Sequence, residues 1–260
     1  MIKGDLDIND IKSTLNKDGF AIVARVLDRG LIEELIEAVD RIESTANSSA
    51  SGVLTRDGGV YGARDLLARD PIFRELAHRP EIRRLVEPIL GDDAFVVRGL
   101  LFDKTPELNW NLPWHQDLTI AVRARCDLPG FGPWTLKEGV PHAHAPSELL
   151  GRMLTIRLHL DDCGAGSGPM RVLPGSHAFG RLSPGETAAW IARQGDRSRL
   201  CVVPAGGAVL MRPLLLHGSI AATETGRRRT IHLEFAAERL PGGLEWRETC
   251  ISAPIGNGEE

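Results

Sequence analysis

The sequence has little cysteine, no long apolar run and no excess of positive charge. Its four cysteines, Cys126, Cys163, Cys201 and Cys250, are far apart and form no CxxC pair, so neither a zinc ribbon nor a redox motif is expected. No stretch of about 18 apolar residues occurs, so no membrane partner is expected. A net charge of -4 argues against a nucleic-acid partner, because such proteins usually carry a basic patch.

The start of the chain is also too polar for a secretory signal segment. It runs MIKGDLDINDIKSTLNKDGF and contains no continuous apolar core. Together with cysteines that suggest reduced thiols, this predicts a cytoplasmic protein. The 260 residues are 42% hydrophobic and 25% charged, which is ordinary for a globular protein. We expect a single domain over residues 1–260.

The front of the chain, residues 1–93, is expected to be mainly helical. In residues 27–45 the apolar residues follow helical spacing, with Asp28 as the expected N-cap. Residues 70–93 predict two short helices, because proline suits a first helical turn and glycine a helix end. The polar segment 44–65 between them has no periodicity and is expected to be a loop.

The back of the chain, residues 94–240, predicts barrel strands. Its segments are short, rich in Val, Ile, Leu and Thr, and separated by Gly, Pro and Asp, a pattern typical of a sandwich or barrel. Residues 125–148 interrupt the pattern with four prolines and two histidines. A long insertion directly after the segment that contains His115 and Asp117 is a candidate lid.

Two metal ligands are expected on a strand at residues 112–120, LPWHQDLTI. Successive strand side chains point to opposite faces, so His115 and Asp117 would share one face. A third ligand must come from a distant strand, and His217 is the candidate because the adjacent Gly218 allows close backbone approach. Two histidines and one carboxylate form the facial triad of non-haem Fe(II) oxygenases, which leaves positions open for substrate and O2.

A cationic anchor follows the third ligand in the sequence. Arg228 begins the segment RRTIHLEF, and its guanidinium could grip a carboxylate at two points. A dicarboxylate co-substrate that chelates the iron needs such an anchor at its far end, and Ser219 could add a hydroxyl hydrogen bond. Arg227 and Arg229 are rivals, although on a strand both would face away from Arg228.

The segments DGFAIVARVLD, WHQD, LHLDDCGAGSGPMRVLPGSH and HGSIAATETGRRRTIHLEF occur in this order. Together they resemble the phytanoyl-CoA dioxygenase-like family of Fe(II)/2-oxoglutarate oxygenases, over about residues 15–240. The resemblance implies a mainly β fold, a double-stranded β-helix (a jelly-roll or cupin-like barrel) flanked by N-terminal helices. It implies that His115, Asp117 and His217 bind Fe(II). Arg228 would bind the distal carboxylate of 2-oxoglutarate, and Lys104 matches a family position near this co-substrate.

The resemblance implies a dioxygenase that hydroxylates an aliphatic C–H bond of a small molecule with O2 and releases succinate and CO2. Asp117 favours hydroxylation, because related halogenases have a small residue there that leaves room for chloride. The main alternative is a metal-binding cupin-like sensor or binding module without turnover, which would not need Arg228. A cupin-type isomerase or extradiol dioxygenase would usually need more histidine or glutamate ligands. Neither the substrate nor the oligomeric state follows from the sequence.

Overall fold

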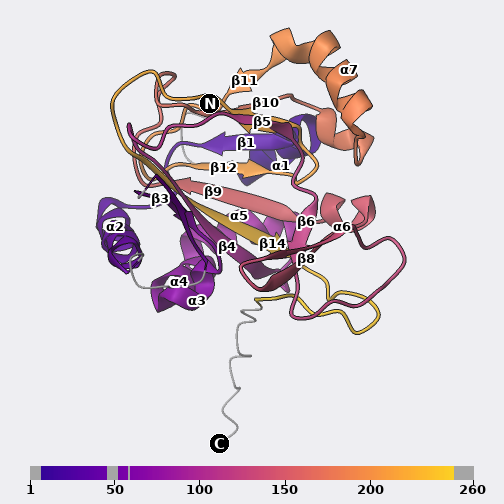
Figure 1. The fold of residues 1–260 in the computed structure, drawn as a ribbon. Helices are drawn as coiled ribbons and strands as arrows, with labels where there is room; N and C mark the ends of the chain where they lie inside the picture. The colour runs from indigo at the N-terminus through magenta and orange to yellow at the C-terminus, as the bar shows by residue number, and fades with distance from the viewer. Residues whose placement is uncertain (1–6, 46–51, 58, 249–260) are drawn as a thin grey trace, which may run out of the picture.

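The computed structural model describes residues 7–45, 52–57 and 59–248, which form antiparallel sheets with helices (Figure 1). Cys250 and residues 46–51 and 58 of the expected loop lie outside the described residues. The helices are α1 (Ile8–Asp18), α2 (Arg29–Ser44), α3 (Leu66–Arg69), α4 (Pro71–His78), α5 (Pro80–Leu90), α6 (Ser147–Gly151) and α7 (Pro184–Gln194), with the 3-10 turns η1 (Ser176–Phe179) and η2 (Gly195–Arg197). Within these ranges, no helix has both the length and the apolar character needed to cross a membrane.

Helix α2 shows why the front of the chain is helical. The Asp28 carboxylate accepts a hydrogen bond from the Leu31 N–H at 2.8 Å, which satisfies one of the unpaired donors at the helix start. The buried residues of the helix recur at helical spacing, so one stripe faces the core; they are Leu31, Leu35, Ala38, Val39 and Ile42. Both the expected helix and its expected cap are confirmed.

Prolines mark the starts of the next two helices. Pro71 and Pro80 occupy the first positions of α4 and α5, where a missing N–H has no cost. Gly91 ends α5, and its N–H donates to the Glu87 carbonyl at 2.8 Å. The expected pair of short helices is therefore confirmed.

The strands form three sheets whose pairings are all antiparallel among the described residues. The large sheet has the order β1-β12-β9-β14-β4-β3-β2, the second β11-β10-β13-β5 and the third β6-β8-β7. The bounds are β1 (Phe20–Val23), β2 (Val53–Arg56), β3 (Gly59–Ala63), β4 (Phe95–Lys104), β5 (Leu112–His115), β6 (Thr119–Ala121), β7 (Trp134–Lys137), β8 (Val140–His144), β9 (Leu154–His159), β10 (Met170–Val172), β11 (Arg199–Leu200), β12 (Ala208–Met211), β13 (His217–Ser219) and β14 (Arg228–Ala236). The mainly β fold class is thus confirmed.

At β14 the large sheet has one apolar and one polar face. On β14 the alternate residues Ile231, Leu233 and Phe235 belong to the core cluster that also contains the buried residues of α2, α4 and α5. The helices therefore cover this face of the sheet, as Figure 1 also shows. We call the opposite face of the large sheet the inner face. On β14 it carries four buried polar residues, Arg228, Thr230, His232 and Glu234.

The second sheet packs against the inner face. Val209 and Met211 of β12 share a buried cluster with Met170 and Val172 of β10. The large and second sheets therefore enclose a space that is apolar near β12 and polar near β14. The functional residues described below line this space.

Two segments expected to be irregular contain hairpins. Strands β2 and β3 lie inside the expected loop 44–65, and β7 and β8 lie inside the expected insertion 125–148. Glu138 and Gly139 both have positive φ and join Lys137 to Val140, which fits a tight two-residue hairpin turn. Asp57 also has positive φ and is followed by Gly58 in the sequence. The sequence pairs Asp57-Gly58 and Glu138-Gly139 are typical of hairpin turns, although the segments around them show no periodicity.

Candidate metal centre and co-substrate site

The three expected metal ligands lie together where β5 pairs with β13. His115 ends β5, His217 begins β13, and the two are direct partners in the antiparallel register with ring centroids 4.2 Å apart. One ligand atom from each of His115, Asp117 and His217 lies within 4.8 Å of the others. In the part of the chain that the structure describes, this is the one group of His, Cys, Asp or Glu side chains arranged so closely.

Gly218 allows the two histidine strands to approach each other. A Cβ atom at this position would lie 2.7 Å from the Leu112 carbonyl oxygen and 3.2 Å from that of Pro113. Both oxygens belong to the backbone of β5, so they could not move aside as the end of a flexible side chain could. The expectation of a close backbone approach at Gly218 is confirmed.

The expected continuous strand at 112–120 is wrong. Strand β5 ends at His115, and the chain then enters β6 of a different sheet at Thr119. The side-chain amide of Gln116 stabilises the chain where β5 ends. Its Nε2 donates to the carbonyls of Gly180 and Leu214 at 2.8 and 2.7 Å. Asp117 is fixed by its N–H, which donates to the Pro213 carbonyl at 2.9 Å. Asp117 therefore lies beside His115 because of these bonds, not because of strand alternation.

Backbone carbonyls orient both imidazoles. Nδ1 of His115 lies 2.8 Å from the Pro113 carbonyl oxygen, and Nδ1 of His217 lies 2.9 Å from that of Leu215. A carbonyl only accepts, so each Nδ1 carries the proton and each Nε2 keeps its lone pair. Both Nε2 atoms face Asp117, at 3.7 Å for His115 and 3.6 Å for His217.

The protonation states also suit a divalent metal. Burial lowers the pKa of His217 to about 4, although Asp117 opposes the shift. Burial would raise the pKa of Asp117, but His217, His232, His115 and Arg98 together lower it to about 2. At neutral pH His217 is therefore a neutral nitrogen donor and Asp117 an anionic oxygen donor, as metal coordination requires.

The donor set fits Fe(II). Asp117 Oδ2 is buried and has no hydrogen-bond partner among the described residues. A buried carboxylate oxygen without a partner is costly unless a cation occupies the space that it faces. With the two Nε2 lone pairs it completes the two-histidine, one-carboxylate set that leaves open positions on the metal.

Arg228 lies on the inner face at the start of β14. It is buried, and its Nε and Nη1 have no hydrogen-bond partner within the described ranges. The guanidinium contacts the thiol of Cys163, and burial lowers the pKa of Arg228. A buried guanidinium with free N–H groups is ready to bind a carboxylate at two points.

Lys104 and Ser219 lie beside this arginine. Lys104 is the register partner of Arg228, and its Nζ donates to the Ile220 carbonyl at 2.6 Å and to Ser219 Oγ at 3.4 Å. Burial, followed by Arg228 and Arg157, lowers the pKa of Lys104 to about 7. An anion bound here would therefore favour the charged form of this amine.

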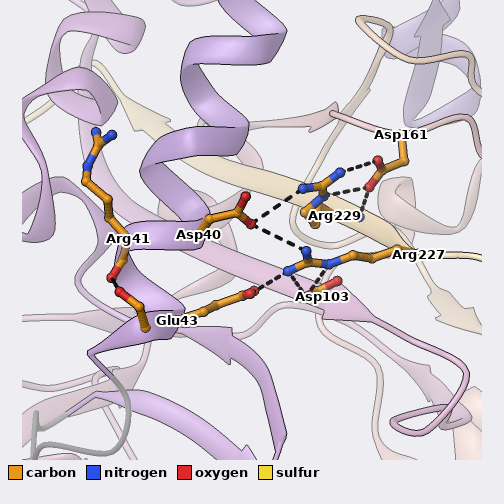
Figure 2. Close-up of polar contacts among 8 residues, drawn as sticks. Asp40, Arg41, Glu43, Asp103, Asp161, Arg227 and Arg229 are labelled. Carbon is orange, nitrogen blue, oxygen red and sulfur yellow. Dashed lines mark hydrogen bonds and ion pairs between the residues drawn. The ribbon is translucent and has the colours of Figure 1, made fainter.

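Arg227 and Arg229 point to the opposite side, toward α2 (Figure 2). Arg227 donates to Asp103 Oδ2 at 2.8 and 2.9 Å and also pairs with Glu43 of α2. Arg229 binds Asp161 through both carboxylate oxygens, at 2.7 and 3.0 Å. Both rivals are thus engaged in ion pairs on the outer side, which leaves Arg228 as the arginine of this cluster on the inner face.

Sequence analysis missed several polar residues of the inner face. Arg157 of β9 is buried, and its Nη2 donates to Thr230 Oγ1 at 3.2 Å. Arg98 of β4 forms a buried ion pair with Glu234, which also lies 3.2 Å from His232 Nε2. The signal was present in TIRLHL and TIHLEF, where polar residues occupy every second position of otherwise apolar strands.

One of the two histidines of segment 125–148, His142, is buried rather than exposed to solvent. His142 on β8 is 3% exposed, and its Nδ1 lies 3.0 Å from the Val140 carbonyl oxygen. Burial lowers the pKa of His142 to about 4. The cause is the pairing of β8 between β6 and β7, which gives His142 a neighbouring strand on either side.

Solved structures share this fold. AviO1 from Streptomyces viridochromogenes Tue57 is 24% identical, with a TM-score of 0.65 over 92% of this chain and 99% of that chain. EctD from S. alaskensis with bound Fe is 17% identical, with a TM-score of 0.69 over 92% of this chain and 80% of that chain. At these identities the likeness concerns the fold.

Curated relatives match at similar identity. L-proline trans-4-hydroxylase of Streptomyces griseoviridis is 24% identical over 249 residues, which cover 84% of this chain and 82% of the relative. Phytanoyl-CoA dioxygenase domain-containing protein 1 of Mus musculus is 26% identical over 204 residues, 73% of this chain. The chain covers 62% of the length of that second relative.

Fold, donor set and relatives together define the class, the Fe(II)- and 2-oxoglutarate-dependent dioxygenases. A model of the phytanoyl-CoA dioxygenase (PhyH) family matches residues 15–230, and the chain belongs to that family. Fe(II) and the co-substrate 2-oxoglutarate are accordingly its cofactors.

We expect His115→Ala and His217→Ala each to lose most of the bound metal, because two ligands hold Fe(II) far less well than three. The purified protein should contain about one Fe(II) per chain, as a single facial triad implies. Metal analysis after dialysis measures this. His177→Ala is the matched control, since His177 bonds to the Asn16 carbonyl outside the triad. If the variant that carries both His115→Ala and His217→Ala still bound one Fe(II) per chain, the ligand assignment would be contradicted.

Proposed function

We propose that this protein hydroxylates an aliphatic C–H bond of a small molecule, with His115, Asp117 and His217 as the ligands of Fe(II). In the balanced reaction, substrate, O2 and 2-oxoglutarate give hydroxylated substrate, succinate and CO2. The single observation that carries the proposal is the cluster of three ligand atoms within 4.8 Å, with Oδ2 of Asp117 unpartnered. When bound, the iron and 2-oxoglutarate supply the oxidative chemistry.

The residues of this chain bind and orient the reactants. The carbonyls of Pro113 and Leu215 fix the tautomer and direction of the two imidazoles. Arg228 binds the distal carboxylate of 2-oxoglutarate; Lys104 assists from the adjacent strand β4, and Ser219 from β13 of the second sheet. Asp117 keeps a carboxylate at the third ligand position, which favours hydroxylation over halogenation.

The architecture proposed for this reaction is a double-stranded β-helix within one domain over residues 1–260. Two observations support it: antiparallel sheets that share the cluster of Val209 and Met170, and TM-scores of 0.65 to 0.69 to AviO1 and EctD. An enclosed space between two sheets keeps water away from the reacting groups. The cytoplasmic location expected from the cysteines stays a prediction.

Residues 125–148 are proposed to form a lid over the substrate. By register, Lys137 and His142 share one face of the third sheet. Burial lowers the pKa of both groups, and Arg98 of the inner face lowers both further. Arg98 also donates to the Thr119 carbonyl of β6 at 3.1 Å. The third sheet therefore lies against the inner face beside Asp117.

The comparison with L-proline trans-4-hydroxylase supports a small-molecule substrate. A metal-binding module without turnover is the second candidate. Arg228 favours the enzyme, because a plain metal site gains nothing from a buried guanidinium with free N–H groups.

Succinate formation decides between these two candidates. The iron-loaded protein should release succinate and CO2 from 2-oxoglutarate under air, and a true substrate should raise the rate. The screen should begin with free amino acids, and His217→Ala should abolish the signal. A protein that binds stoichiometric iron but yields no succinate across the screen would favour the metal-binding module.

Arg228→Ala should weaken 2-oxoglutarate binding by about two orders of magnitude. Two charge-assisted hydrogen bonds are worth about 1.5–3 kcal/mol each, and about 1.4 kcal/mol is tenfold in affinity. Arg228→Lys should rescue only in part, because lysine lacks the planar fork. Calorimetry measures the affinity, and iron content should not change. Arg229→Ala is the control; a large loss there and none at Arg228 would reverse the assignment.

The lid should become more protected when the site is filled. Hydrogen exchange of residues 125–148 should slow when metal, 2-oxoglutarate and substrate are bound, because a closed lid opens less often. Helix α5 (Pro80–Leu90), which lies on the opposite face of the large sheet, provides the reference. Equal protection of the lid in the empty and filled protein would indicate a static insertion instead.

A further inference from the structure

The inner face buries three cations that have no anionic partner. Lys104, Arg157 and Arg228 are 2%, 8% and 3% exposed. Among the described residues none of the three forms an ion pair with a carboxylate, whereas the neighbouring Arg98 is paired with Glu234. A buried charge without an opposite charge is costly, so this part of the inner face is suited to an anion. The proposed function assigns the distal carboxylate of 2-oxoglutarate to Arg228 and Lys104. It assigns no anion to Arg157.

The guanidinium of Arg157 is held in place but not fully used. Its Nη2 donates to Thr230 Oγ1 at 3.2 Å, and its plane lies over the ring of Phe102, 5.0 Å from the centroid. Its Nε is buried and has no hydrogen-bond partner within the described part of the chain. The side chain is therefore oriented by its neighbours and keeps donor capacity for a ligand.

The span of β14 from Arg228 to Thr230 is comparable to the length of a five-carbon dicarboxylate. Thr230, to which Arg157 bonds, lies two residues beyond Arg228 on the same face of β14. Two residues of a strand span about 7 Å. In extended 2-oxoglutarate the two carboxyl carbons are about 5 Å apart, from four C–C bonds of about 1.5 Å. A five-carbon dicarboxylate therefore fits along the row from Arg228 to Thr230, where the guanidinium of Arg157 is held.

The direction from Arg228 to Arg157 leads toward the metal ligands. The next inner-face residue after Thr230 on β14 is His232, which is the register partner of Arg157 on β9. Burial and Arg228 lower the pKa of Arg157 to about 10, and Asp117 opposes this shift. Arg157 therefore lies within electrostatic reach of both the distal anchor and the metal-binding carboxylate.

We infer that Arg157 is a second carboxylate anchor, which binds the C1 carboxylate end of 2-oxoglutarate while Arg228 binds the C5 carboxylate. The inference rests on the proposed function, because it takes 2-oxoglutarate as the ligand between the two arginines. Two guanidinium groups at fixed separation set both the position and the direction of the co-substrate. The free Nε of Arg157 is the donor that gains a partner.

The first test measures 2-oxoglutarate binding to protein loaded with Ni(II), which prevents turnover. Arg157→Met should weaken binding at least tenfold, and Arg157→Lys should restore part of the loss. The affinity for Ni(II) alone should be unchanged, which separates anchoring from an effect through Asp117. Arg212→Met is the matched control, since Arg212 is a partly buried arginine that donates to the Met153 carbonyl, away from this site.

The second test assigns the end of the ligand. 2-Oxopentanoate lacks the C5 carboxylate of 2-oxoglutarate, and 4-oxopentanoate lacks the C1 carboxylate. In competition with 2-oxoglutarate, Arg157→Met should weaken 2-oxopentanoate and leave 4-oxopentanoate unchanged, and Arg228→Met should do the reverse. Circular dichroism and Ni(II) stoichiometry identify any variant that fails to fold, and Arg157→Lys then carries the comparison.

Two results would overturn the inference while the proposed function stands. One is wild-type affinity of the Arg157 variants for 2-oxoglutarate when the Arg228 variant is impaired. The other is a selective loss of 4-oxopentanoate binding in Arg157→Met, which would place Arg157 at the distal carboxylate. If the wild-type protein binds no 2-oxoglutarate, the proposed function itself fails, and this inference with it.

Discussion

The antiparallel register that sets His217 opposite His115 is the constraint on which the metal centre depends. It exists because β13 approaches β5 closely at Gly218, where a side chain would collide with the backbone of Leu112. A site built on paired strands is held more precisely than one built on loops. Asp117 lies outside the strand, yet its N–H and the amide of Gln116 tie it to the segment that leads into β13.

The inner face combines this centre with an unusual concentration of buried charge. Arg98 and Glu234 neutralise each other, but Lys104, Arg157 and Arg228 do not have such partners among the described residues. Their cost to folding is offset by the opposite face of the same strands, where Ile231, Leu233 and Phe235 pack against the helices. The strands are thus stabilised by apolar packing on the helix-covered face and carry the buried polar residues on the inner face.

Much of this could be predicted from the sequence, because hydrophobic period and ordered motifs are local signals. The helix after Asp28, the mainly β class and the grouping of His115, Asp117 and His217 followed from such signals, and strand alternation separated Arg228 from Arg227 and Arg229. The break after His115 did not follow, because it depends on the Gln116 amide finding carbonyls about 64 and 98 residues away in sequence. The burial of His142 does not follow from the sequence either, since it depends on which strands pair on either side of β8.

Arg157 illustrates a different limit. The alternation in TIRLHL indicates a polar face that includes Arg157, but it does not say what that face meets; the register with His232 identifies it as the inner face. The partner of Arg157 on this face is the neutral hydroxyl of Thr230 and not a carboxylate, so its positive charge is not neutralised there. Both the face on which Arg157 lies and its partner depend on which strands pair in the folded protein, and a short sequence segment does not encode that pairing.

The alternation along β9 and β14 also bears on how such an enzyme can change. On the proposed function, a substitution at an inner position that holds neither Fe(II) nor 2-oxoglutarate alters what the cavity recognises, while the apolar residues between such positions keep the helices attached. Selection can therefore act on ligand preference and on folding through separate sets of positions in the same strand. A library that varies those inner positions alone would explore new substrates with little loss of foldable variants, and Arg98 and Glu234 should be varied together because they form a buried ion pair.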